Sequence, residues 1–250
     1  MAVSLATLGA LLAGAWLGHA LRLRLPPIQW STEATATIKL MVTLLACVAG
    51  LALASLLASS KAGFDEVRTE VNQNASRVHQ LDQLLGGYGP EAAPLRTELA
   101  AQYAAFVQVL QDGRREDLPR LTSHDTVRAW DDLQRGIAAL HAANEKQRLL
   151  QREAIDVAGA IGESHWNIAL KKEGYLSTPL MVTLVAWLVV MFGMFGLLAP
   201  SDPHPRAAIA TSALLVALVV PLILEMNLPL AGAIRVSATP LLAVLAQLGH

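Results

Sequence analysis

The side chains that could carry out chemistry are scattered along this 250-residue chain. No two histidines have the i, i+4 spacing with which one helix face binds zinc. They stand at His19, His79, His124, His141, His165, His204 and His250. The sequence contains no phosphate-binding loop, dinucleotide turn or nucleophile elbow, and the single Cys47 excludes an internal disulfide. The sequence therefore predicts a protein that is not an enzyme, with no catalytic residues, no metal site and no cofactor.

A second set of polar side chains, Glu225, Asn227 and Arg235, lies at the end of the last long apolar stretch. A charge at the centre of a bilayer costs about 2.5–3.5 kcal/mol on insertion scales, so charged side chains there pair or face water. Two interpretations stay open, an ion pair at the membrane surface or a place in an ion path. Because prolines interrupt residues 227–250, we expect this segment to turn back along the membrane surface.

The elements that must position these residues are four apolar stretches. The chain is 54% hydrophobic and only 16% charged, against about 25% charged in ordinary soluble domains. About 20 apolar residues suffice for a helix to cross a bilayer, and a spanning segment in such a chain must be helical. The predicted spans are Val3–Leu21, Ile38–Ser59, Thr178–Ala199 and Ala207–Met226. Arg22 and Arg24 follow the first stretch, the reverse of the order in a signal peptide, so we expect it to be retained.

Between the second and third spans, residues 61–177 are too polar for lipid and too periodic for a linker. Their first part has apolar residues at alternating spacings of three and four, which is typical of a coiled-coil seam with one polar member. The seam includes Phe64, Val67, Val71 and Asn74. Its register continues back into the second span, so we expect one helix from Ile38 to Leu85. Further helical periods follow, including one long helix from about Trp130 to Ile168.

These patterns predict an all-α membrane protein in four parts. Residues 1–60 form the first two spans and residues 61–177 form a coiled-coil-like helical domain. The third and fourth spans occupy residues 178–226, and residues 227–250 form an interfacial segment. The net charge of −1 gives no global field that would attract nucleic acid.

Small residues recur every fourth position in both of the first two spans. One stripe is Ala6, Ala10, Gly14 and Gly18, and the other is Ala46, Gly50, Ala54 and Ala58. Small residues at this spacing let membrane helices approach closely. The contact lies either within one subunit or between subunits. The seam that continues from the second span favours an oligomer.

Several stretches resemble the bacterial bestrophin-like domain family of unknown function. They are Thr178–Trp187, Phe195–Pro200, Leu222–Asn227, Ile234–Ser237, Leu81–Leu85 and Tyr88–Arg96. The resemblance implies distant kinship with bestrophins, pentameric anion channels with four spans and a helical domain. Bestrophins narrow their pore with apolar side chains of the second span. By position alone, the resemblance implies Met41, Leu44, Val48 and Leu51 as pore-lining candidates. No run of acids matches the bestrophin calcium clasp.

The first functional hypothesis is a homo-oligomeric, bestrophin-like ion channel that passes chloride or other small anions, with the second span near the pore. Family analogy favours a pentamer over a tetramer. The alternative is a non-conducting membrane scaffold or sensor that binds a partner through its helical domain. We expect a multi-pass protein of the bacterial inner membrane. By the positive-inside rule, the cations of the two short loops between spans predict a periplasmic helical domain, whereas the large domain of bestrophins is cytosolic.

Overall fold

The structure is a computed structural model that describes residues 2–24, 32–114, 116–170, 178–200, 202–231 and 234–248. Within these ranges the regular structure is helical and there is no β-strand, as the sequence predicted. The chain divides into two units. We call residues 1–62 with 175–227 the membrane unit, and residues 63–174 with 228–250 the helical unit. The predicted domain boundary at residue 177 lies outside the described residues.

The membrane unit consists of α1 (Ala2–Arg24), the first part of α2 (Thr32–Tyr88), α6 (Thr178–Leu198) and α7 (Pro203–Met226). These are four helices that are long and apolar enough to cross a membrane. Both α6 and α7 have proline in their first turn, where the missing N–H costs no helical hydrogen bond. Apolar side chains from all four helices form one cluster, which includes Leu11, Ala49, Leu184, Phe192, Ala213 and Ile223.

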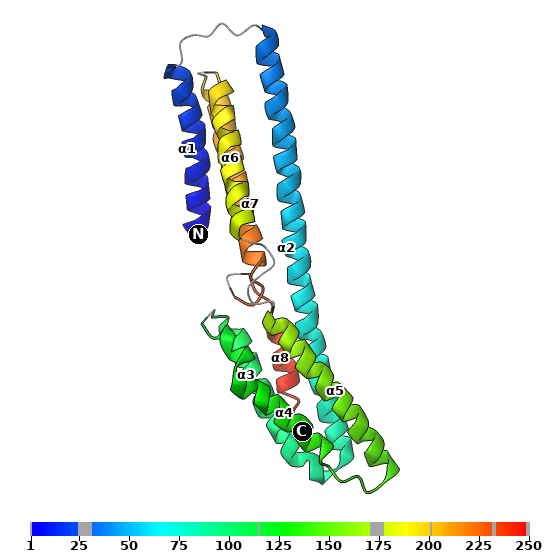
Figure 1. Ribbon diagram of the computed structural model, residues 1–250. Helices are drawn as coiled ribbons and strands as arrows, with labels where there is room; N and C mark the ends of the chain where they lie inside the picture. Colours follow the sequence, from blue (N-terminus) through cyan, green and yellow to red (C-terminus); the bar gives the residue numbers. More distant parts are fainter. Residues whose placement is uncertain are drawn as a thin grey trace. The chain divides into compact units, whose positions relative to one another are not determined.

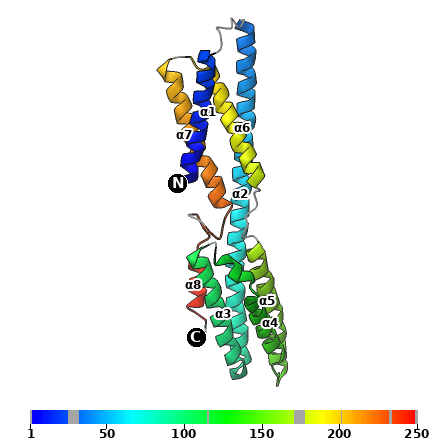
Figure 2. The same ribbon diagram turned by 60° about the vertical axis from the view of Figure 1, so that its left-hand side comes forward.

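The small residues of the first span form a close contact between α1 and α6, which lie side by side in both views (Figure 1, Figure 2). A Cβ added at Gly14 would lie 2.6 Å from the carbonyl oxygen of Val189, and one at Gly18 would meet the carbonyl oxygen of Gly193. In the same way, a Cβ at Gly196 would meet the carbonyl oxygen of Ala15. The two backbones are therefore in contact where only glycine fits, and the first-span stripe packs within one chain.

Replacing Gly18 with leucine should prevent α1 from packing on α6, because the new side chain would meet backbone rather than a movable side chain. We expect a loss of about 3 kcal/mol or more, at the upper end for overpacking. Thermal unfolding of the purified variant in detergent measures it. The matched control is Gly9→Leu on the same helix, where a Cβ meets nothing within 4 Å. Equal melting temperatures for the two variants would contradict the close α1–α6 contact.

Helix α2 is continuous over 57 residues, which corresponds to about 85 Å at 1.5 Å per residue. It contains the predicted range Ile38–Leu85 and extends beyond it at both ends. The helix ends at Tyr88, because Gly89 has a φ of 129°, a conformation that side chains rarely adopt. Pro90 then begins the short 3₁₀ helix η1 (Pro90–Ala92).

Where the structure describes it, the helical unit contains the second part of α2 and six further elements. They are η1, α3 (Ala93–Asp112), η2 (Leu118–Thr122), α4 (His124–Ala138), α5 (Glu145–Leu170) and α8 (Thr239–Leu245). Each contributes apolar side chains to one core, which includes Val78, Leu81, Tyr103, Leu133, Ile161 and Leu241. Helix α3 ends at Gly113, which has the left-handed conformation of a helix C-cap, with φ 58°.

The prediction of one long helix from about Trp130 to Ile168 is wrong. The chain leaves the helical conformation after Ala138, and α5 begins at Glu145. The break is stabilised at the new helix start, where the Gln147 N–H donates to the Asn144 side-chain oxygen over 2.8 Å. The cap of α4 is Ser123, whose hydroxyl accepts from the Thr126 N–H over 3.3 Å.

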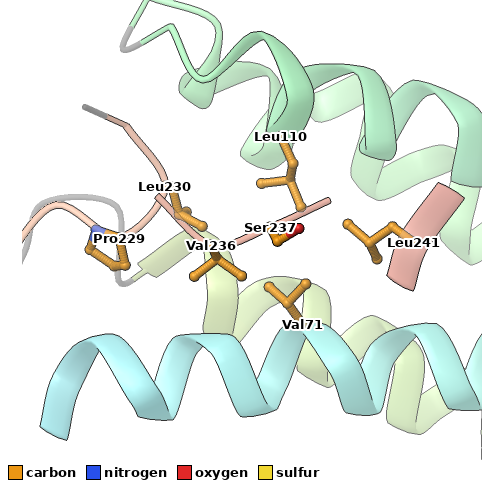
Figure 3. Close-up of a pocket in the computed structure, with 7 residues that line it drawn as sticks. All are labelled: Val71, Leu110, Pro229, Leu230, Val236, Ser237 and Leu241. Carbon is orange, nitrogen blue, oxygen red and sulfur yellow. The ribbon is translucent and has the colours of Figure 1, made fainter. Parts of the chain in front are cut away.

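The C-terminal segment packs between α2 and α3 of the helical unit. Figure 3 shows its residues between Val71 of α2 and Leu110 of α3, around a cavity of only about 10 Å³. The segment turns on itself, and the Val236 N–H donates to the Pro229 carbonyl over 3.0 Å. Leu241 is fully buried. The expected position at the membrane surface stays a prediction, but part of the apolar face of α8 is covered by the chain itself.

Candidate pore-facing surface of α2

In the membrane unit, α2 presents three faces that differ in side-chain size and in burial. Successive residues of a helix are rotated by about 100°. The packed face carries Val42 and Ala49, which are both buried, and Leu53, which contacts the apolar cluster of the membrane unit. This face attaches α2 to its own chain and leaves the other two faces available for lipid, water or another subunit.

The second face carries the four pore-lining candidates. On the helical wheel they fall within an arc of about 80°, centred about 140° from the packed face. The exposed fractions are 59% for Met41, 66% for Leu44, 45% for Val48 and 73% for Leu51. Ser55 and Ser59 continue the same arc and are also exposed. The arc therefore changes along the helix from large apolar side chains to small hydroxyls.

The third face carries the small residues of the second span. Gly50 lies about 140° from the centre of the large apolar arc on the helical wheel. A Cβ added at Gly50 would meet no atom within 4 Å. Ala54 is exposed and Ala46 is half-buried. Unlike the stripe on α1, most of this stripe is not covered by the chain itself, so another helix has room to approach it.

The seam residues on the second part of α2 lie mainly in the core of the helical unit. Val67 and Val71 are buried in that core, and Phe64 is half-buried. Asn74 is 1% exposed, and its side-chain amide donates to the Ile161 carbonyl of α5 over 3.5 Å. Burial within one chain accounts for the spacing of Val67, Val71 and Asn74. Their predicted role in holding copies of the chain together stays untested.

The three polar residues at the membrane edge are divided between the two units. Glu225 is half-buried in α7, and Asn227 is buried, with its backbone N–H donating to the Ile223 carbonyl over 3.0 Å. Arg235 belongs to the helical unit, where it donates to the Asp112 carbonyl over 3.2 Å. An ion pair between Glu225 and Arg235 stays a prediction, as does a place in an ion path.

Sequence reasoning missed an ion pair that joins α2 to α3. Arg96 donates two hydrogen bonds, both 2.8 Å long, to the two carboxylate oxygens of Asp82. This bidentate geometry is the strong form of the interaction, and hydrogen bonding to Asp82 raises the pKa of Arg96. Both residues stand in the stretches that resemble the bestrophin-like family. Their separation of 14 positions across a turn concealed the pairing.

A buried histidine was also missed because the histidines were considered only as scattered residues. His165 is 6% exposed, and burial lowers its pKa below that of a free histidine. It follows Ala154, Ala158 and Ile161 on the buried face of α5. A histidine at a core position of an apolar stripe is a signal that the sequence contains. Within the described ranges, no three His, Cys, Asp or Glu side chains are grouped so that they could hold a metal ion.

Over its described residues the chain is helical and has four helices of membrane-crossing length and composition, which defines a polytopic helical membrane protein. Residues 9–241 match the family described as the bestrophin-like domain, so the chain belongs to the bestrophin-like family and the resemblance in the sequence is confirmed. No curated protein matches the chain.

Solved structures show the same fold. Two crystal structures of a bacterial bestrophin homologue from Klebsiella pneumoniae, each carrying a different single mutation, are similar to this chain. The first has a TM-score of 0.60 and 16% identity over 96% of this chain and 95% of the other. The second has a TM-score of 0.59 and 15% identity over 96% of this chain and 94% of the other. At such identities the likeness concerns the fold alone.

Proposed function

We propose that this protein is a homo-oligomeric channel of the cell membrane that passes small anions, with the large apolar arc of α2 lining the pore. The observation that carries the proposal is the exposure of four large apolar side chains on one face of α2, which are Met41, Leu44, Val48 and Leu51. The helix packs against its own chain through a different face. Membership of the bestrophin-like family supports the assignment, since the distant relatives that give the family its name are anion channels.

The physical argument for gating rests on the size and polarity of these side chains. A ring of leucine, valine and methionine side chains around an axis makes a narrow apolar section from which water withdraws. An ion then crosses only when the section widens or gains polar groups. Ser55 and Ser59 continue the same arc, so the wall of the proposed pore changes from apolar to hydroxyl-bearing along α2.

Replacing Val48 with threonine should raise anion conductance, because the hydroxyl has nearly the shape of the lost methyl group and keeps water in the narrow section. We expect an increase of about threefold or more in chloride flux, measured in liposomes at equal protein content.

The control is Leu218→Thr on α7, where the wild-type side chain is 57% exposed. It makes a similar polar change on another apolar helix and should leave the flux unaltered. If the Val48 and Leu218 variants behaved alike, the large apolar arc would face lipid rather than a pore. Silence of the verified wild-type assembly across pH and voltage would favour the non-conducting scaffold.

Assembly should depend on the small-residue face of α2. Gly50→Leu should fold as a protomer, because its added side chain meets no atom of its own chain, but it should weaken the oligomer by separating the helices. Light scattering after size exclusion in detergent measures the mass of wild type and variant. We expect a closed oligomer, with the pentamer preferred over the tetramer by family analogy, and partial dissociation in the variant. A wild-type monomer at every concentration would contradict assembly.

The structure also bears on orientation, because the ends of three helices meet at one end of the membrane unit. Arg22 of α1 donates to the Ala199 carbonyl just after α6, and Arg206 of α7 lies 3.5 Å from the His19 ring nitrogen. The end of α1 and the start of α7 are therefore close to each other. Their cations add to one side, and the positive-inside rule predicts that this side is cytoplasmic. We propose that the helical unit faces outward.

A cysteine at Glu116 tests the orientation in a Cys47→Ala background. Glu116 is 67% exposed in the helical unit. The neighbouring Gly113 is unsuitable because its φ is 58° and a Cβ there would meet Arg235. We expect a membrane-impermeant thiol reagent to label Glu116→Cys on intact cells and to label Glu33→Cys, an exposed position beside the cationic loop, only after the membrane is broken. The reverse pattern would place the helical unit in the cytoplasm.

A further inference from the structure

A cleft of about 540 Å³ opens in the helical unit between α3, η2 and α4. Its volume lies within the usual range of small-molecule sites, about 300–1,000 Å³. The aromatic side chains of Phe106 and Trp130, and the ring of His165 from α5, line it. The ring centroids of Phe106 and His165 are 4.8 Å apart, and those of Trp130 and His165 are 6.1 Å apart. The proposed channel activity makes no use of this cleft.

The hydrogen bond of His165 fixes which of its nitrogens carries the proton. Its Nε2 lies 2.9 Å from the Leu121 carbonyl oxygen. A carbonyl can only accept, so Nε2 is the donor. In the neutral ring that burial favours, Nδ1 is left with a lone pair. Nδ1 receives no hydrogen bond from the described residues, so it remains available as an acceptor.

Gln102 also lines the cleft, and its side chain also has an acceptor without a donor. Its side-chain amide donates to the Ala129 carbonyl over 2.8 Å and to the Glu98 carboxylate over 3.0 Å. Its Oε1 is buried and has no partner among the described residues. Leaving a buried acceptor without a donor is unfavourable. His165 and Gln102 both line the cleft, and each has an acceptor that no described residue satisfies.

The charged side chains around the cleft favour a cationic ligand. Asp112, Asp117 and Asp125 line it, and Arg120 is the one cationic side chain among the described lining residues. Arg120 is itself paired with Asp117 at 3.3 Å. The acceptors of His165 and Gln102 thus lack donors, the net charge of these four side chains is negative, and aromatic rings are present to stabilise a cation.

We propose that this cleft binds an organic primary ammonium ion carried on an apolar body. The N–H groups of the ligand would supply the donors that His165 and Gln102 lack, and the carboxylates would compensate its charge. The apolar body would lie against Phe106 and Trp130. The three N–H donors of a primary ammonium distinguish it from a quaternary ammonium ion, which has the charge and no donor.

Calorimetric titration of the full-length protein in a neutral detergent with phenethylammonium tests the proposal. We expect saturable binding of one ion per chain. Choline, a quaternary ion, should bind at least about tenfold more weakly, by the value of a lost hydrogen bond to a buried acceptor. Phenylacetate, which has a similar ring and a negative charge, should not bind. No saturable binding of phenethylammonium in the millimolar range, or equal binding of choline or phenylacetate, would overturn the proposal.

Three variants locate the binding in the cleft. Asp125→Asn should weaken binding by about two- to fivefold, the size expected for a solvent-exposed charge. Asp131→Asn makes the same change on the same helix at an exposed position that does not line the cleft, and it should have no effect. Ala105→Trp should abolish binding by filling the cleft, while the ligand-free melting temperature shows that the variant is folded. Binding that survives Ala105→Trp would place the ligand elsewhere. These readouts are independent of conduction.

Discussion

The backbone of α2 has to remain hydrogen-bonded in surroundings of two kinds. Where the helix is apolar enough to cross a membrane, no water replaces a broken hydrogen bond, and the i→i−4 ladder is kept without interruption for 57 residues. Only the side chains change along its length. Residues 40–60 contain no charge, and charged residues become frequent from Lys61 onward. One continuous helix therefore supplies apolar contacts to the core of the membrane unit through Ala49 and to that of the helical unit through Val71.

The two small-residue stripes show that one spacing can stand in two different surroundings. On α1, Gly14 and Gly18 lie against the backbone of α6, and neither position has room for a Cβ. On α2, Gly50 has the same four-residue spacing with its neighbours and nothing of its own chain within 4 Å of a Cβ. The difference lies in what packs opposite each helix, which the sequence of the helix does not encode. For the stripe on α1 the structure shows contact within one chain, whereas contact between subunits through the stripe on α2 stays a proposal.

Features that depend on the residues of one segment were predictable, whereas features that depend on what packs against that segment were not. The sequence predicted the end of the second helix at Leu85, and the helix ends at Tyr88, before Gly89, whose conformation excludes a longer helix. The break before α5 was missed because apolar residues recur on both sides of it, and only the local cap at Asn144 marks it. A coiled-coil seam and a core within one chain share the same three-four spacing. The spacing therefore predicted that Val67 would be buried, but not which helices would cover it.

The two candidate sites were predictable to different degrees, because one lies on a single helix and the other is assembled from several elements. The large apolar arc of α2 comes from one helix, and the spacing of its side chains can be calculated from the sequence once a helix is assumed. The family resemblance then directs attention to that arc. The cleft of the helical unit brings together side chains from α3, η2, α4 and α5. No spacing along the chain relates Gln102 to His165, and the tautomer of His165 depends on a carbonyl of η2.

The absence of charge from the membrane part of α2 constrains how the proposed channel would choose its ions. Between Lys39 and Lys61 the sequence has no ionisable side chain except Cys47, so a pore lined by this stretch has no ring of fixed cations to attract anions. Selection would then depend on the cost of removing water at the apolar arc, and on hydroxyl dipoles at Ser55 and Ser59 that replace part of the lost hydration. An anion that gives up its hydration shell more easily meets a smaller barrier in such a section. The apolar arc would therefore set both the closed state and the order of permeation, whereas charges outside residues 40–60 would act on the local concentration of ions.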